Sequence, residues 1–441
     1  MGKYLIHTYG CQMNVHESEK LAGILEERGY TLADSNENAD VIVFNTCAIR
    51  ESAEKKIFGH IGDLKQLKKK NPNMIICVCG CMSQQNGYDE MLLQKYPYID
   101  IIFGTHNIAK FGELLDKRNK IKKHFSSIVT TENIIDRDSM PKTRTSGINA
   151  WVNINYGCNN FCTYCIVPYV RGREISRPLD AIVCEVKQLL DAGYKQITLL
   201  GQNVNSYGND FDDDTCFAKL LNILDKLDYE YRLTFMTSHP KDLSSEVINV
   251  ISKSKHIMHY IHLPFQSGSN RILGLMNRKY TREKYLATVK EIKEKIPNVQ
   301  LSSDIIVGFP TETEEDFLDT MDLVKQVGFE QLFMFIYSKR KGTVAEKMDG
   351  QVDIKVKKER LRRLIELQQG IGEKISETFV GKDLVVLIDS VSPKYAGSVV
   401  GSTNFNKAVT VKGDASLIGK FVKVRITKAK LTSLFGEVIK E

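Results

Sequence analysis

Apolar runs of strand length alternate with helical patterns over the first part of the chain. The runs lie at residues 4–8, 41–44, 74–78 and 99–103, and apolar positions recur at helical spacing at residues 17–28 and 51–68. Such alternation predicts a parallel sheet with right-handed crossovers. We therefore expect an α/β domain over residues 1–140, with a polar linker at residues 126–147.

The alternation resumes after the linker. Apolar runs lie at residues 151–156, 197–201, 231–236, 260–265, 301–307 and 331–337, and helical patterns separate them at residues 179–192, 217–227, 243–251, 281–296 and 313–327. Six strand–helix units of this spacing predict an open, partial (β/α)6 barrel of TIM type over residues 145–375.

The pattern changes near the C-terminus. A basic amphipathic helix is predicted at residues 355–369, and short alternating runs follow at residues 384–388, 397–400, 408–411, 421–426 and 434–439. Short strands separated by Gly, Ser and Asp predict a small antiparallel barrel of OB type over residues 376–441. The fold class is therefore α/β, with a C-terminal β-barrel.

The composition of the chain indicates the compartment in which the protein works and the kind of partner that it binds. No export signal and no 18-residue apolar stretch is evident, so we expect no membrane span. Ten cysteines without an export signal favour a reducing cytoplasm, where thiols more often bind metal than form disulfides. The net charge is +7, and from residue 339 onward 21 Lys and Arg outnumber 12 Asp and Glu. This favours a polyanionic partner, with a solvated surface as the alternative.

Three cysteines follow the first strand of the predicted central barrel in a C-x3-C-x2-C spacing, namely Cys158, Cys162 and Cys165. Three thiolates in one loop suit a [4Fe–4S] cluster with one open iron. A structural zinc site would need a fourth ligand nearby, and the next cysteine, Cys184, lies in a pattern that predicts a buried helix face. The remaining alternative is three unrelated buried thiols.

A second set of cysteines follows the first three strands of the N-terminal domain, namely Cys11, Cys47 and Cys81. Parallel strands bring their carboxyl ends to one edge, so these thiols should converge and could hold a second cluster. Cys79 could serve in place of Cys81, whereas Cys77 is expected to be buried in its strand.

These motifs resemble two known families. The loop at residues 156–165, with Tyr164 before its last cysteine, resembles the signature of radical S-adenosylmethionine (SAM) enzymes. The sequences Tyr-Gly-Cys-Gln-Met-Asn (residues 9–14), Asn-Thr-Cys-Ala-Ile-Arg-Glu (45–51) and Gly-Cys-Met-Ser-Gln (80–84) resemble the three cysteine motifs of the methylthiotransferases. The resemblance implies two [4Fe–4S] clusters and bound SAM, with Cys11, Cys47 and Cys81 on the auxiliary cluster. Cys77 and Cys79 lie outside the family pattern.

The barrel rim supplies further expected SAM contacts. Gln202 and Asn203 stand where radical SAM enzymes commonly carry an acidic residue that accepts from the SAM amino group. The run from Asp304 through Val307 and Gly308 resembles the segment whose backbone packs against the SAM adenine. We expect no catalytic residue beyond the cluster ligands, and structural or hydrogen-bonding roles for His239 and His262.

Basic residues point to RNA. Arg171, Arg173 and Arg278 lie near the rim, where they could contact phosphate or be solvated. The C-terminal barrel resembles the TRAM domain, an RNA-binding unit, which implies RNA contacts for Lys423, Arg425 and Phe405. Protein docking is the alternative role for this barrel.

The resemblance implies a reaction. The motifs around Cys11 and Cys47 resemble most the branch that converts N6-isopentenyladenosine at position 37 of tRNA into its 2-methylthio derivative. One SAM would methylate sulfur on the auxiliary cluster, and a second SAM would supply the radical that abstracts hydrogen from C2 of the base. The expected partners are the tRNA anticodon stem-loop and an electron donor such as a flavodoxin-type protein, and the chain is expected to be a monomer. Alternatives are threonylcarbamoyladenosine tRNA, a ribosomal-protein aspartate, or a non-catalytic iron–sulfur RNA-binding redox sensor.

Overall fold

The computed structural model describes residues 2–48, 51–129, 143–144 and 147–439, and it divides into two compact units. Unit 1 contains residues 1–145, 156–159 and 165–174, and unit 2 contains residues 146–155, 160–164 and 175–441. Both units contain parallel strand–helix units of the kind that the hydrophobic pattern predicts, and unit 2 also contains the C-terminal barrel. None of the helices among these described ranges is long and apolar enough to cross a membrane.

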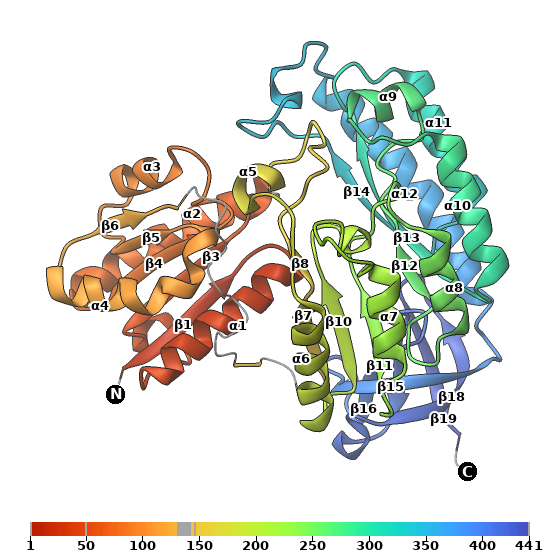
Figure 1. Cartoon of the computed structure of the whole chain (residues 1–441), viewed down its shortest axis with the longest axis horizontal. Coiled ribbons are helices and arrows are strands. Elements are labelled where there is room, and N and C mark those ends of the chain that lie inside the picture. Colours follow the sequence, from red (N-terminus) through yellow and green to blue (C-terminus); the bar gives the residue numbers. More distant parts are fainter. Residues whose placement is uncertain (1, 49–50, 130–142, 145–146, 440–441) are drawn as a thin grey trace. The chain divides into compact units, whose positions relative to one another are not determined.

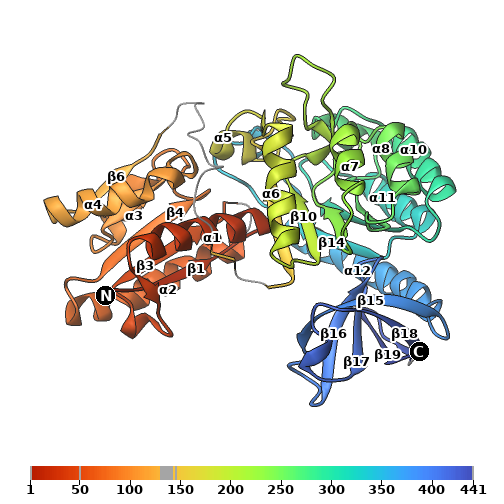
Figure 2. The ribbon, with the colours of Figure 1, turned by 60° about the horizontal axis from the view of Figure 1, so that its bottom comes forward.

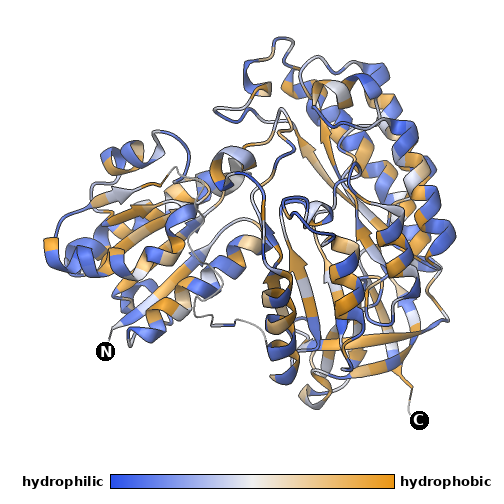
Figure 3. Cartoon of the chain, in the orientation of Figure 1, coloured by the Kyte–Doolittle hydropathy of each residue, from blue (hydrophilic) through white to orange (hydrophobic). Residues whose placement is uncertain are grey.

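Unit 1 is built on one parallel sheet in the order β2-β1-β3-β4-β5-β6. Its strands are β1 (Lys3–Thr8), β2 (Thr31–Leu32), β3 (Val41–Thr46), β4 (Ile75–Gly80), β5 (Ile101–Phe103) and β6 (Phe125–Ser127). Its helices are α1 (Gln12–Glu27), α2 (Glu51–Lys70), α3 (Tyr88–Lys95) and α4 (Phe111–Ile121). Apolar side chains of α1 and α4 cover one face and those of α2 and α3 the other, and Figure 3 shows the apolar strands between helices with polar outer faces. Both faces of the central strands are therefore buried.

The four strands predicted for this domain are present, and two short edge strands join them. β6 begins at Phe125 and so overlaps the start of the predicted linker, because its backbone pairs with β5. Most of the rest of that linker, residues 130–142 and 145–146, lies outside the described residues, as do residues 49 and 50 of the second cysteine motif.

Unit 2 contains the predicted six-stranded parallel barrel (Figure 1). Its strands are β7 (Asn149–Asn153), β10 (Gln196–Leu200), β11 (Arg232–Phe235), β12 (Tyr260–His262), β13 (Gln300–Val307) and β14 (Gln331–Ile336). β7, β10 and β11 form one sheet, β12, β13 and β14 form another, and a single bridge between Leu233 and Ile257 links the end of the first to the segment before β12. The partial (β/α)6 barrel is thus confirmed.

Helices pack outside this barrel. They are α6 (Leu179–Asp191), α7 (Phe217–Asp225), α8 (Ser245–Lys253), α10 (Arg282–Lys295) and α11 (Glu314–Val327), with the short α9 (Asn270–Leu275) after β12. Their apolar residues join the strands in one continuous core. Around the first strand lie three short elements, β8 (Asn155–Tyr156), α5 (Val167–Arg171) and β9 (Ile175–Ser176).

Helix α12 (Ile354–Glu377) is longer than predicted. The Asp353 side chain caps its start by accepting from the backbone N–H of Lys355. Its second half continues because Ile371 packs on the core of the TIM-type barrel and Ile375 on the core of the C-terminal barrel. Tertiary contacts therefore extend the helix beyond the predicted range of residues 355–369.

The C-terminal strands close into a barrel in the order β15-β16-β17-β19-β18 (Figure 2). They are β15 (Asp383–Val391), β16 (Ser398–Thr403), β17 (Ala408–Lys412), β18 (Phe421–Ala429) and β19 (Ser433–Val438). The small barrel was correctly predicted, but β17 and β19 pair in parallel rather than antiparallel. Closure leaves the barrel without an open sheet edge.

Candidate functional site

Cys11, Cys47 and Cys81 lie at one edge of the sheet in unit 1. Each follows one of three neighbouring parallel strands, β1, β3 and β4. The Cys81 N–H donates to the carbonyl of Thr46 at 3.0 Å, so the third motif lies directly against the second. A Cβ atom added to Gly10 would lie 3.0 Å from the Cys47 Sγ, and Gly10 has φ +115°. A glycine is therefore required for the first motif to approach the second.

This edge combines burial with positive charge. Burial raises the pKa of the Cys81 thiol to about 12, and the Arg171 guanidinium opposes that rise. Arg171 is itself buried, with Nη1 2.8 Å from Glu17 Oε1 and Nη2 2.7 Å from Asn14 Oδ1. Cys11 precedes the first residue of α1, whose N-terminal dipole also favours an anion. Arg171 and the N-terminus of α1 thus oppose the effect of burial on the thiols at this edge.

Cys77 and Cys79 have different surroundings. Both lie inside β4, are fully buried and pack in the apolar core on the α1 side of the sheet. Burial raises both pKa values well above that of an ordinary thiol. The structure therefore gives these two side chains the environment of core residues.

The segment after Cys165 packs on the same edge of unit 1. Ile166 and Val170 form one small apolar cluster with Cys81 and Ala48. The hydroxyl of Thr105 donates to the Val170 carbonyl at 2.5 Å. The residue that follows the last cysteine of the C-x3-C-x2-C loop is therefore in an apolar cluster with a cysteine of the other set.

Cys158 is fixed within unit 1 by its backbone. Its N–H donates to the carbonyl of Gly172 at 3.1 Å. Gly157 has φ +71°, and a Cβ atom there would lie 1.9 Å from the carbonyl oxygen of Arg173. No other residue type fits this position, so the glycine before Cys158 sets the start of the loop.

Cys162 belongs to unit 2, where the segment at residues 276–278 holds it. The Asn277 side chain donates to the Phe161 carbonyl at 3.0 Å, and the Thr163 N–H donates to the Met276 carbonyl at 3.1 Å. Arg278 Nη1 lies 3.5 Å from the Cys162 Sγ. Cys162 and Arg278 are both buried.

The chemistry of the donors fits iron–sulfur clusters better than hard metal ions. Each set consists of three thiols, and soft thiolate ligands select such clusters. Among the described residues, no three His, Cys, Asp or Glu side chains are grouped as ligands of a single bare metal ion. The residues that fit iron–sulfur clusters are therefore the two sets of thiols, one at the sheet edge and one in the C-x3-C-x2-C loop.

Asn203 presents an acceptor that fits an amino group. Its Nδ2 donates to Asp242 Oδ2 at 2.7 Å. This hydrogen bond turns the Asn203 Oδ1 atom away from Asp242. Oδ1 is buried and has no hydrogen-bond partner among the described residues. A buried carbonyl oxygen left unpaired costs about 1–3 kcal/mol, which a bound donor would recover. Gln202 beside it is only half-buried.

His239 is a neutral imidazole. Burial, Arg278 and Lys241 together lower the pKa of its imidazole to about 2. Its Nδ1 accepts from the Lys241 N–H at 3.2 Å, so the proton is on Nε2. His262, in contrast, has Nε2 3.6 Å from Asp304 Oδ2 and its Nδ1 2.9 Å from Ser302 Oγ. Both histidines are thus held by hydrogen bonds or an ion pair.

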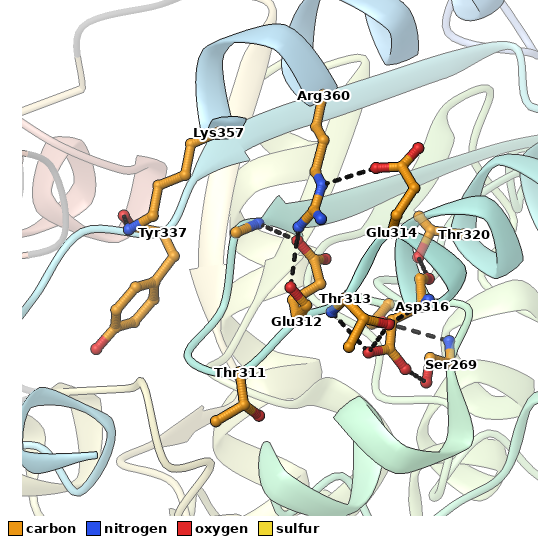
Figure 4. Close-up of polar contacts among 12 residues, drawn as sticks. Ser269, Thr311, Glu312, Thr313, Glu314, Asp316, Thr320, Tyr337, Lys357 and Arg360 are labelled. Carbon is orange, nitrogen blue, oxygen red and sulfur yellow. Dashed lines mark hydrogen bonds and ion pairs between the residues drawn. The ribbon is translucent and has the colours of Figure 1, made fainter. Parts of the chain in front are cut away.

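The loop after β13 is held by a buried carboxylate (Figure 4). Glu312 Oε2 accepts from the Gly308 N–H at 2.5 Å and pairs with Arg360 of α12 at 2.9 Å. Burial raises the pKa of Glu312 to about 7, while Gly308 and Arg360 act in the opposite direction. Gly308 has φ +72°, and a Cβ atom there would lie 2.3 Å from the Cγ of Lys357. The Lys357 ammonium donates to the Tyr337 carbonyl at 3.1 Å.

The loop is also fixed at the start of α11. Thr313 and Asp316 form a capping box, and the Ser269 hydroxyl donates to Asp316 at 2.6 Å (Figure 4). Glu312 and Arg360 were not singled out in the sequence, because a pair 48 residues apart leaves no local signal.

The residues expected at RNA differ in exposure. Arg171 and Arg278 are buried, whereas Arg173, Lys423 and Arg425 are exposed. Phe405 is half-buried, with its ring centroid 5.9 Å from that of Phe379 and 6.4 Å from that of His259.

A second aromatic pair lies on the C-terminal barrel. The rings of Tyr395 and Phe435 meet edge to face at 5.6 Å. Lys394 lies over the first ring and Lys430 over the second, at 5.7 and 5.2 Å. Both rings are half-buried, so they combine stacking surface with positive charge. Tyr395 and Phe435 are far apart in the sequence, so no local pattern indicates that their rings meet.

Three family models match the chain in sequence order. They are Uncharacterized protein family UPF0004 at residues 3–104, the Radical SAM superfamily at residues 152–324 and the TRAM domain at residues 377–439.

Curated relatives match almost the whole chain. A protein of Thermoanaerobacter pseudethanolicus is 53% identical over 437 residues, which cover 99% of this chain and 92% of the relative. A protein of Clostridium botulinum is 50% identical over 441 residues, which cover 100% and 97%. A protein of Acetivibrio thermocellus is 49% identical over 445 residues, which cover 99% and 91%. All three carry the name tRNA-2-methylthio-N(6)-dimethylallyladenosine synthase.

Solved structures share the fold at low identity. The radical SAM methyltransferase TsrM from Kitasatospora setae, with cobalamin and a [4Fe–4S] cluster bound, aligns with a TM-score of 0.58 at 13% identity. That alignment covers 90% of this chain and 80% of the methyltransferase. The cobalamin-dependent radical enzyme OxsB aligns with a TM-score of 0.52 at 13% identity, over 83% and 56%. These similarities concern the fold alone.

Proposed function

Because the chain belongs to the family of the tRNA-2-methylthio-N(6)-dimethylallyladenosine synthases, we propose that it adds a methylthio group to C2 of N6-isopentenyladenosine at position 37 of tRNA. The observation that carries the proposal is about 50% identity over more than nine-tenths of the length of relatives with this name. The meeting of the two cysteine motifs in unit 1 supports it, since one carbon atom must receive both a radical and a sulfur.

The enzyme uses two [4Fe–4S] clusters and SAM. We assign Cys11, Cys47 and Cys81 to the auxiliary cluster and Cys158, Cys162 and Cys165 to the cluster that binds SAM. When bound, these groups supply the methylthio sulfur, the methyl group and the 5′-deoxyadenosyl radical. The thiols of this chain fit both clusters by donor type.

The residues of the barrel rim would bind SAM. Asn203 Oδ1 would accept from the amino group of SAM, and we assign Gln202 and Tyr164 as further SAM contacts. The backbone at Val307 and Gly308 would lie against the adenine, because Glu312 and Lys357 hold Gly308 in its left-handed conformation. Asp304 lies on the same strand.

His239 and His262 would orient ligands rather than move protons in the hydrogen-abstraction step. His239 is neutral, since its pKa is lowered to about 2, and it would donate a hydrogen bond from Nε2. Radical abstraction of hydrogen requires no base, so the proposal needs no catalytic residue beyond the cluster ligands.

Exposed cations would hold the anticodon stem-loop. Lys423 and Arg425 lie on the outer face of β18, and Arg173 follows α5. Phosphate contacts of this kind fix the RNA while the base leaves its stack. Tyr395 and Phe435 offer the stacking surface, while Phe405 packs against Phe379 and His259. The buried Arg171 and Arg278 act on Cys81 and Cys162, respectively, and we assign them no RNA contact.

We further propose that the enzyme is a cytoplasmic monomer that receives its electrons from a flavodoxin-type protein. Ten cysteines suit a reducing compartment, and a net charge of +7 suits an acidic donor. Light scattering of the anaerobic holoenzyme measures its molar mass and so tests whether it is a monomer.

Nucleoside analysis tests the activity and the branch. The reconstituted enzyme would be incubated without oxygen with SAM, a reductant and tRNA bearing isopentenyladenosine, with threonylcarbamoyl tRNA and ribosomal protein in parallel. A mass gain of one methylthio group on the isopentenyl nucleoside alone is expected. A gain on either other substrate would change the branch, and SAM binding without cleavage would favour the redox sensor.

A further inference from the structure

We propose that Arg278 sets the reduction potential of the cluster that Cys162 binds, as a buried positive charge that hydrogen-bonds to the cysteine sulfur. The proposal rests on the proposed function in one respect, namely that Cys162 is a cluster ligand. Arg278 is a positioning residue in this account, because it acts on the cluster through the thiolate.

The guanidinium is fixed by three polar contacts. Nη2 donates to the Pro264 carbonyl at 2.7 Å, Nε donates to the Tyr280 hydroxyl at 3.2 Å, and Nη1 points to the Cys162 Sγ at 3.5 Å. Tyr280 in turn donates to the Phe265 carbonyl at 2.8 Å. The third N–H group is therefore aimed at the sulfur by a rigid, planar fork.

The backbone around Arg278 is held in an uncommon conformation. Asn277 and Lys279 both have positive φ, at 59° and 58°, and neither is a glycine. Asn277 also donates to the loop that carries Cys162. Two left-handed residues that flank one side chain are kept only where the surroundings over-determine them, which is typical of functional positions.

Arg278 differs in its partners from three other buried arginines. Arg171, Arg177 and Arg360 each pair with a carboxylate within 3 Å. Arg278 is 4% exposed and forms no ion pair with a carboxylate among the described residues. An anion stabilises a buried guanidinium most, and among the groups that Arg278 contacts the Cys162 sulfur is the one that carries a negative charge as a thiolate.

The position of Arg278 predicts the direction in which it shifts the reduction potential of the cluster. Reduction adds one electron to the cluster and so makes its sulfur ligands more negative. A positive charge and an N–H donor beside one ligand stabilise the reduced form more than the oxidised form, which raises the potential. Arg278 would therefore make the cluster easier to reduce by the one-electron donor.

Redox titration of variants tests this proposal without using turnover. The full chain would be prepared with Cys11, Cys47 and Cys81 changed to Ala, so that one cluster remains, and reconstituted anaerobically without SAM. The potential would be followed by electron paramagnetic resonance for Arg278, Arg278→Lys and Arg278→Gln. The matched control is Arg282→Gln, which removes a cation that instead pairs with Asp319 and Asp322.

Arg278→Gln should lower the ratio of reduced to oxidised cluster about tenfold at a fixed potential, which is a fall of about 59 mV for a one-electron couple. Arg278→Lys should fall between Gln and the parent, and Arg282→Gln should match the parent. Equal potentials for Arg278→Gln and the parent would overturn the proposal.

Where Arg278→Gln binds less iron than the parent, Arg278→Lys decides instead: a lower potential supports the proposal and an unchanged one overturns it. Failure of the parent itself to bind iron would contradict the assignment of Cys158, Cys162 and Cys165, not the role of Arg278.

Discussion

The buried surroundings of the Glu312 side chain disfavour its ionised form. Burial raises its pKa to about 7, although Arg360 lies 2.9 Å away and the Gly308 N–H donates to it. The ordinary pKa of an unfolded glutamate is about 4.3. The folded chain therefore keeps a proton on Glu312 over a pH range in which the unfolded chain has lost it.

This difference makes stability depend on pH through one residue. The stabilisation from Glu312 is present in full below the unfolded pKa and is lost as pH rises through about 7. The Glu312→Gln variant does not titrate at this position. We expect it to gain up to about 3 kcal/mol on the wild type between pH 4.5 and 7.5.

Urea unfolding of the full chain across this pH range measures the difference. Glu314→Gln is the control, because it removes the other acidic partner of Arg360 at a half-exposed site. A constant difference between Glu312→Gln and the wild type at every pH would show that Arg360 compensates fully for burial.

At the scale of elements, α5 is attached to α1 by one buried ion pair. Arg171 ends α5, and Glu17 lies in α1, 154 residues earlier. Both side chains are less than a tenth exposed. Because α5 follows the C-x3-C-x2-C loop and α1 follows Cys11, the pair connects the two cysteine motifs within unit 1.

Removal of one partner should destabilise unit 1 strongly. Arg171→Met removes the buried guanidinium that pairs with the Glu17 carboxylate, and breaking a buried ion pair from one side typically costs about 3–5 kcal/mol. The double variant Arg171→Met, Glu17→Leu should recover most of that loss, because it removes both charges. Chemical denaturation followed by circular dichroism measures each free energy.

Arg173→Met provides the control two residues away. Its side chain is exposed, so we expect a change within about 0.5 kcal/mol. Equal stability of Arg171→Met and Arg173→Met would contradict the role given to the ion pair.

The elements that the sequence predicted are those with a local signal. Alternating apolar runs located β1, β3, β4 and the six strands of the TIM-type barrel, and the cysteines at their ends needed only the rule that parallel strands end at one edge. The pair of Arg171 with Glu17 and the pair of Arg360 with Glu312 have no such signal, since each joins distant segments. The same limit explains why Arg278 was expected at RNA yet is buried beside Cys162.

At the scale of the whole molecule, the C-terminal barrel is fixed to the TIM-type barrel of unit 2. The Lys407 ammonium lies 2.6 Å from Glu330, and both groups are buried. Arg232 donates to the carbonyls of Ser402 and Thr403 at 2.9 and 3.1 Å. The exposed cations of β18 are therefore held in the same unit as the rim of the TIM-type barrel, and Figure 2 shows the two barrels joined by α12.

Binding of tRNA should depend on salt through these cations. Each phosphate contact removed lowers the slope of log affinity against log salt concentration by about 0.7 to 1. We expect this change for Lys423→Gln and no change for Lys290→Gln, whose ammonium is exposed on α10. Filter binding at several salt concentrations measures both. Equal slopes for the two variants would place the RNA elsewhere.

In the proposed reaction, the two cysteine sets have separate tasks. The most direct test of this division compares Cys47→Ala and Cys162→Ala with the wild type, with 5′-deoxyadenosine and methylthiolated nucleoside measured in the same anaerobic reactions on isopentenyl tRNA. We expect both products from the wild type, 5′-deoxyadenosine alone from Cys47→Ala, and neither from Cys162→Ala. Full methylthiolation by Cys47→Ala would contradict this division.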